Sequence, residues 1–216
     1  MSYALRSAVL NLQSLILLVP VILLALSVHE FSHGLVAYRL GDPTAKNAGR
    51  LTLNPISHLD PIGTIMLFLV HFGWAKPVPV DPRYFANPKR DMLRVALAGP
   101  VSNMILAFLS GLVIRLIKVN PDPFIGNFMG EAFIAMMYLS IEINLILAVF
   151  NLLPIPPLDG SKILYGLLPP EYDHIAYNLE RYGPFILLAL LLLGRNVLGF
   201  IIGPFVGFFM TLFAGA

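Results

Sequence analysis

Long runs without a charged residue alternate with short polar connections along the chain. The runs cover residues 7–28, 61–75, 95–114, 143–158, 182–194 and 196–216. An α-helix needs about 20 mostly apolar residues to cross a bilayer. The first, third and last runs have this length. The fourth does if it begins near Ala132 and includes Glu142, and the fifth can extend back towards His174. The pattern predicts an all-α polytopic membrane protein with five to six transmembrane helices.

The run at residues 61–75 is too short to cross as a helix, because it would reach only about 22 Å against a hydrocarbon core of about 30 Å. Basic residues crowd the stretch around it: Arg39, Lys46, Arg50, Lys76, Arg83, Lys89, Arg90 and Arg94. The positive-inside rule places such a stretch in the cytoplasm. We therefore expect a re-entrant segment at 61–75, with the N-terminus outside and the first helix ending inside.

Residues 50–54 show a different period. Leu51 and Leu53 alternate with polar neighbours between Gly49 and Pro55. Alternation with a period of two is typical of a β-strand. The sequence predicts a short membrane-associated β-strand here, as part of a hairpin.

Composition agrees with a membrane protein. Hydrophobic residues make up 57% of the chain and charged residues 12%, against about 25% charged in soluble domains. Cysteine is absent, which excludes disulfides and thiolate metal ligands. A net charge of +2 gives no reason to expect nucleic acid. We expect a single membrane-embedded domain over 1–216, with a core at 7–168 and a C-terminal helical pair at 174–216.

The sequence HEFSH stands at the end of the first apolar run. His29 and His33 are four residues apart, so a helix places both on one face, where they can bind one metal ion. Glu30 lies beside them and can act on a metal-bound water. A charged residue in a membrane helix costs about 2.5–3.5 kcal/mol, which a bound metal would offset. The alternative is a helix end wetted among the lipid headgroups.

A catalytic zinc usually has three protein ligands and one water, so a third ligand must come from elsewhere. Three carboxylates lie in or beside other apolar segments, Glu131, Glu142 and Asp159, and Asp159 stands in the sequence NLLPIPPLDG. Three prolines break the helix there, and irregular backbone at membrane depth is tolerated where it lines a cavity. The alternative is that Asp159 is the N-cap of a helix starting near Ser161.

The sequence AGPVSN interrupts a later apolar run and leaves Asn103 inside the membrane. Its amide can donate to a carbonyl oxygen that develops negative charge, or it can form an interhelical hydrogen bond. Glu142 and Asn144 lie within another run. An intramembrane carboxylate such as Glu142 is a functional candidate, although it can also be protonated and bonded to a neighbouring helix.

Together, HEFSH, GPVSN and NLLPIPPLDG resemble the motifs of the site-2 protease family of intramembrane zinc metalloproteases. The similarity is to its compact prokaryotic type, without PDZ or CBS domains. The resemblance implies one Zn²⁺ per chain, with His29, His33 and Asp159 as ligands, Glu30 as the catalytic carboxylate, and Asn103 as a group that binds substrate or transition state. It implies hydrolysis of a peptide bond within or near a transmembrane segment of a membrane-protein or membrane-anchored substrate.

Several further residues are candidates for the same reaction. The predicted strand could pair with an extended substrate through Arg50, Leu51, Thr52, Leu53 and Asn54. His58 could reach the site, and Asn151 could orient the turn at Asp159. On this topology all the motifs meet near the cytoplasmic face of the cell membrane. Two other classes stay open: a catalytically silent membrane scaffold of the same fold, and a small metal or proton transporter using His29, His33 and Glu142.

Overall fold

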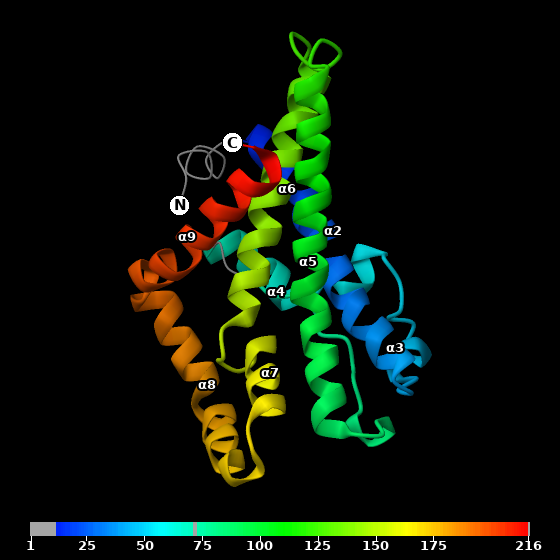
Figure 1. The fold of residues 1–216 in the computed structure, drawn as a ribbon, viewed down its shortest axis with the longest axis vertical. Helices are drawn as coiled ribbons and strands as arrows, with labels where there is room; N and C mark the ends of the chain where they lie inside the picture. The colour runs from blue at the N-terminus through cyan, green and yellow to red at the C-terminus, as the bar shows by residue number, and fades with distance from the viewer. Residues whose placement is uncertain (1–11, 71–72, 216) are drawn as a thin grey trace.

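The computed structural model of the chain describes residues 12–70 and 73–215. The α-helices in this part are α2 (Leu12–Arg39), α3 (Thr44–Asn47), α4 (Pro61–Val70), α5 (Pro88–Val119), α6 (Phe128–Leu152), α7 (Asp159–Leu167), α8 (Asp173–Leu193) and α9 (Arg195–Ala214) (Figure 1). Three short 3₁₀ helices occupy Pro55–His58, Pro82–Tyr84 and Pro170–Tyr172. The beginning of the first apolar run, residues 7–11, lies outside the described residues.

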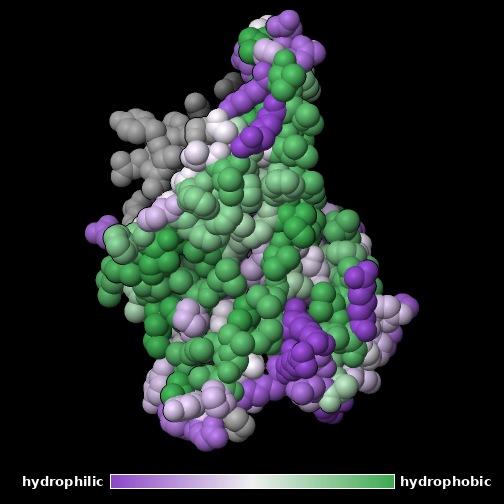
Figure 2. Space-filling view, in the orientation of Figure 1, coloured by the Kyte–Doolittle hydropathy of each residue, from purple (hydrophilic) through white to green (hydrophobic). Residues whose placement is uncertain are grey.

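Five of these helices, α2, α5, α6, α8 and α9, are long and apolar enough to cross a membrane. The prediction of a helical polytopic membrane protein is therefore confirmed. The fifth apolar run does extend backwards, because α8 begins at Asp173. Figure 2 shows the resulting surface, a broad apolar band with hydrophilic residues gathered mainly towards its two ends.

The prediction of a β-strand at residues 50–54 is wrong, since these residues form bends and irregular backbone. Arg50 turns its side chain inward, and Asn54 accepts a hydrogen bond from Ile56 N that starts the 3₁₀ helix Pro55–His58. The only β-type pairing within the described residues is an isolated antiparallel bridge between Leu59 and Ala75. Alternating side chains did not produce a strand, because within the described part of the chain no other strand lies beside residues 50–54 to complete a ladder.

The helix α4 has ten residues and is about 15 Å long, which is about half of what a crossing requires. It is not among the helices long enough to span. Residues 71–72, which follow it, lie outside the described part of the chain. That the segment 61–75 dips into the membrane and returns stays a prediction.

The helix α5 is the centre of the bundle and contacts α2, α6, α7 and α9. Figure 1 shows α5 and α6 side by side, with α7 below the end of α6. A buried cluster joins three of these helices: Ala107, Ile114, Ile141, Leu145 and Ala214. Apart from this cluster, α5 contacts α2 and α7, the two helices from which the predicted metal ligands come.

The connection between α6 and α7 brings the chain back onto the bundle. Residues 153–158 are irregular and contain prolines, one of which follows a cis peptide bond between Pro156 and Pro157. The backbone folds so tightly that a β-carbon at Gly160 would overlap the carbonyl oxygens of Leu152 and Leu153. The first residue of α7, Asp159, therefore lies close to the end of α6.

Candidate metal centre

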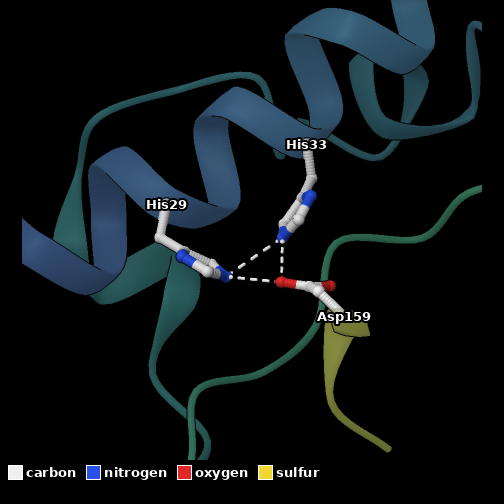
Figure 3. Close-up of side chains that lie close together, drawn as sticks. All are labelled: His29, His33 and Asp159. Carbon is white, nitrogen blue, oxygen red and sulfur yellow. Dashed lines mark hydrogen bonds and ion pairs between the residues drawn. The ribbon is translucent and has the colours of Figure 1, made fainter. Parts of the chain in front are cut away.

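Three buried side chains from two distant parts of the chain converge at the side of α5. His29 Nε2 and His33 Nε2, both on α2, lie 3.0 Å apart, and each lies 3.2 Å from Asp159 Oδ2 at the start of α7 (Figure 3). Two ligands about 2.1 Å from a tetrahedral zinc ion lie about 3.4 Å apart. The observed triangle is thus close to the size that such an ion requires.

Each histidine is held from behind by an oxygen atom. His29 Nδ1 donates to the side-chain oxygen of Asn103 at 2.6 Å, and His33 Nδ1 donates to the backbone oxygen of Val95 at 2.7 Å. A neutral imidazole carries one hydrogen, so donation from Nδ1 leaves Nε2 with a free lone pair. Metal-binding histidines typically have such a partner on the other ring nitrogen.

The donor set fits a cation. Two Nε2 lone pairs and a carboxylate face one another, and Asp159 Oδ2 is buried without a hydrogen-bond partner. Burial alone would raise the pKa of the Asp159 carboxyl, but contacts with His29 and then His33 hold this pKa well below its usual range. When both imidazoles carry their single hydrogen on Nδ1, the negative oxygen and the two Nε2 lone pairs repel each other at this separation, so the cluster favours a positive charge between them.

Asp159 does not cap the helix that it begins. Leu158 occupies the N-cap position of α7, and no side chain makes a capping hydrogen bond there. The Asp159 carboxylate points instead towards the two histidines. Asp159 was interpreted from the sequence either as a metal ligand or as the N-cap of a helix, and the structure favours the metal ligand.

Gly99 makes room for the cluster. A β-carbon at this position on α5 would lie 2.5 Å from His33 Nε2 and would overlap the ring of His29. The sequence marked Gly99 only as an interruption of an apolar helix. Its contact with both imidazoles was missed, and the neighbouring proline is the one local signal that could have pointed to it.

Glu30 lies next to the cluster and is held by a separate segment. Its Oε2 accepts a hydrogen bond from Val78 N at 2.8 Å. Glu30 also lines a cavity of about 320 Å³ that contains the metal-ligand cluster. The rest of the lining consists of His29, His33, Pro77, Val78, Val80, Met92, Val95, Ala96, Asn151, Pro157, Asp159 and Lys162. The carboxylate and the cluster thus share one space, and Val78 was not predicted from the sequence.

Arg50 forms hydrogen bonds to the backbone of the segment that contains Val78. This side chain is only 7% exposed, and it donates to the backbone oxygens of Lys76 at 2.6 Å and Pro77 at 3.4 Å. Arg50 does not line the cavity. Its side chain supports the backbone on which Glu30 depends, and its role as a substrate contact stays a prediction.

The neighbours of Arg50 do not reach the cavity either, since Leu51, Thr52, Leu53, Asn54 and His58 are all absent from its lining. His58 is buried, and its Nε2 donates to the backbone oxygen of Thr52 at 2.7 Å. Asn151 does line the cavity, and its amide donates back to Leu147 O in its own helix. No contact between Asn151 and Asp159 supports the predicted orienting role.

Asn103 is placed differently from the sequence expectation. It is fully buried behind His29, and its amide nitrogen donates to Asn144 Oδ1 at 2.7 Å and to Ala25 O at 3.3 Å. Both amide hydrogens are therefore used within the protein, and Asn103 does not line the cavity. Asn103 thus forms interhelical hydrogen bonds, the alternative that the sequence left open, and it orients His29; its binding of substrate or transition state stays a prediction. Glu142, the other polar candidate, is buried in α6.

The fold and the site together define a class: a polytopic membrane protein with a buried cluster of two histidines and one aspartate suited to a metal ion. Comparison with known proteins narrows this class. Residues 113–193 match peptidase family M50. "Putative zinc metalloprotease YwhC" of Bacillus subtilis is 43% identical over 183 residues, which are 84% of this chain and 83% of that protein.

"Putative zinc metalloprotease Rip2" of Mycobacterium tuberculosis H37Rv is 34% identical over 177 residues, which are 79% of this chain and 64% of that protein. A zinc metalloprotease of Methanocaldococcus jannaschii is 30% identical over 126 residues, which are 56% of this chain and 34% of that protein. No solved structure matches the chain. The chain belongs to peptidase family M50, the site-2 protease family of zinc metallopeptidases.

Proposed function

We propose that this protein is an intramembrane zinc endopeptidase that hydrolyses a peptide bond within or near a transmembrane segment of a membrane-protein substrate. One observation carries the proposal: two Nε2 atoms and a carboxylate oxygen that has no hydrogen-bond partner converge beside Glu30 in one cavity. His29, His33 and Asp159 would hold one zinc ion. Zinc in such a site supplies Lewis acidity and an activated water.

Glu30 is the proton carrier of the reaction. Its carboxylate takes a proton from the attacking water as the water oxygen forms a bond to the scissile carbonyl carbon. It then gives that proton to the amide nitrogen as the carbon–nitrogen bond breaks. Val78 N–H keeps one oxygen of the carboxylate in place and leaves the other oxygen to exchange the proton.

The position of the site, on and beside membrane-length helices, supports the proposal of a membrane-anchored substrate. The ligands come from α2, one of the membrane-length helices, and from the break that follows α6, another. A substrate helix hides its carbonyl groups in intrahelical hydrogen bonds, so it must unwind locally before the water can attack. The cavity beside Glu30 is where the unwound backbone would lie.

We place the site near the cytoplasmic face of a cell membrane. The connections between α2 and α5 carry most of the basic residues near the site, and such residues favour the cytoplasm. Figure 1 shows the start of α5, α7 and the start of α8 at one end of the molecule, and the connection between α5 and α6 at the other.

The test is cleavage of a panel of membrane-anchored peptides by the purified protein. Glu30→Gln should retain zinc and lose cleavage by a factor of at least about 10². Glu131→Gln, which removes an exposed carboxylate in the first turn of α6, is the matched control and should cleave normally. Equal turnover by Glu30→Gln and the wild type would contradict the role of Glu30.

The same experiment separates the alternatives. A silent scaffold would cleave none of the peptides with wild-type protein, although it would still bind zinc. A transporter would move metal across vesicles without cleavage. The cluster at His29, His33 and Asp159 is the single group of potential metal ligands found among the described residues, which gives a transport path no second site.

A further inference from the structure

A line of buried polar groups runs from His29 into the middle of the helix bundle. His29 Nδ1 contacts Asn103 Oδ1 at 2.6 Å, Asn103 Nδ2 contacts Asn144 Oδ1 at 2.7 Å, and Asn144 Nδ2 contacts the backbone oxygen of Ser140 at 2.8 Å. Asn103 and Asn144 are both 0% exposed. The line therefore joins α2, α5 and α6, and its two amide side chains are inaccessible to solvent.

The Ser140 carbonyl, at the end of this line opposite His29, determines which group donates in each hydrogen bond. A backbone carbonyl can only accept, so Ser140 O requires the NH₂ group of Asn144 to face it. The oxygen of the Asn144 amide then faces Asn103, and it accepts from the Asn103 NH₂ group. A second carbonyl, Ala25 O, also accepts from this NH₂ group at 3.3 Å. The oxygen of Asn103 is thereby left facing His29.

We propose that Asn144 is a positioning residue that selects the tautomer of His29. Because Asn103 can offer only its oxygen, His29 must place its hydrogen on Nδ1, and Nε2 is left as the atom that can bind a metal. The identity of the metal-binding nitrogen is thus set mainly by the Ser140 carbonyl in α6, which acts through two amides at 2.8 and 2.7 Å, and the longer contact of Asn103 with Ala25 O at 3.3 Å supports the same direction. The inference rests on the proposed metal site but not on the proposed protease activity.

The hydroxyl groups near this line do not determine which group donates in its hydrogen bonds. Ser140 Oγ and Ser110 Oγ lie 2.8 Å apart, and Asn144 Nδ2 lies 3.4 Å from Ser140 Oγ. A hydroxyl can both donate and accept, so it cannot impose a direction on its neighbours. Removing either hydroxyl should leave the Ser140 carbonyl, and hence the tautomer of His29, unchanged.

The experiment compares Asn144→Leu with Ser140→Ala and with the wild type. Zinc affinity is measured by competition with a chelator, and the protonated nitrogen of His29 is identified by ¹⁵N NMR of the metal-free protein. Asn144→Leu should lower zinc affinity by about 10-fold or more, as loss of an outer partner of a ligand does. In this variant, His29 should also be a mixture of two tautomers, one with its hydrogen on Nδ1 and the other with its hydrogen on Nε2. Ser140→Ala should match the wild type in both measurements.

A rescue variant separates the proposal from a general packing defect. In Asn103→Asp combined with Asn144→Leu, the carboxylate has no hydrogen to donate and can only accept from His29. Zinc affinity and the single tautomer should return. If Asn144→Leu fails to fold, Asn144→Ala carries the same expectations.

The proposal is overturned if Asn144→Leu keeps one tautomer and wild-type affinity, if Ser140→Ala loses as much affinity as Asn144→Leu, or if the double variant is not rescued. A protein that binds zinc and shows these differences but cleaves no peptide would overturn the protease proposal alone.

Discussion

Each of the three converging side chains is directed by a feature that lies outside the HEFSH sequence. His29 is held by Asn103, His33 by the backbone oxygen of Val95, and Asp159 by its place at the first residue of α7. These partners lie outside the cavity or form its wall. The geometry of the cluster is therefore a property of α5 and α7 as much as of the HEFSH sequence on α2.

Gly99 offers the sharpest test at the scale of one residue. Gly99→Ala places a methyl group against both imidazoles, so zinc affinity should fall by about 10-fold or more. Gly199→Ala is the matched control, because a β-carbon there meets nothing within 4 Å. Both changes raise helix propensity by about 1 kcal/mol, so their difference isolates the contact with the histidines. Equal zinc affinity, measured by chelator competition, would contradict this account.

The sequence predicted some site residues and missed others for physical reasons. His29, Glu30 and His33 follow from the 3.6-residue period of one helix, which is a local property. Asp159 could be proposed because prolines break the chain beside it. The direction of the Asn103 amide could not be predicted, since it is decided by carbonyls on two other helices.

The extended segment after α4 is the element that completes the site. Arg50 holds its backbone at Lys76 and Pro77, and Val78 N–H then reaches Glu30. Neither Pro77 nor Pro79 has an N–H group, so Val78 is the one donor among residues 77–79. Because an extended segment accepts proline, the donor can be removed with little change in backbone shape.

Val78→Pro should lower kcat for peptide cleavage by about 10-fold or more while zinc affinity stays unchanged, because it frees the Glu30 carboxylate without touching a ligand. Val80→Pro is the control, since this residue lines the same cavity but is not the donor to Glu30. Cleavage kinetics and zinc content are measured on both. Parallel losses in the two variants would show that the segment matters only for its shape.

The long elements were predictable and the short ones were not. An uninterrupted apolar run of sufficient length is enough to specify a membrane-length helix, and all five such helices were anticipated. Residues 50–54 carried a strand pattern, but a strand also needs a partner, which a single stretch of sequence does not supply. The buried Arg50 is one reason why these residues do not form a strand. Its side chain donates a hydrogen bond to the backbone of a distant segment, at Lys76 O.

For the molecule as a whole, the proposed orientation in the membrane can be tested directly because the chain contains no cysteine. Ala48→Cys follows α3, and Asp122→Cys lies in the connection between α5 and α6; both positions are exposed. A maleimide that cannot cross the membrane should label Ala48→Cys only from the cytoplasmic side and Asp122→Cys only from the opposite side. The reverse pattern, or labelling of both from one side, would contradict the proposed orientation.

The proposed activity depends on a metal ion held jointly by α2 and the start of α7. X-ray absorption at the zinc edge of the purified, zinc-loaded protein measures this most directly. We predict one zinc per chain with two imidazole nitrogens at about 2.0–2.1 Å and oxygen in the remaining positions, and one fewer imidazole in His33→Ala. A zinc environment without imidazole, or one that His33→Ala leaves unchanged, would contradict the account.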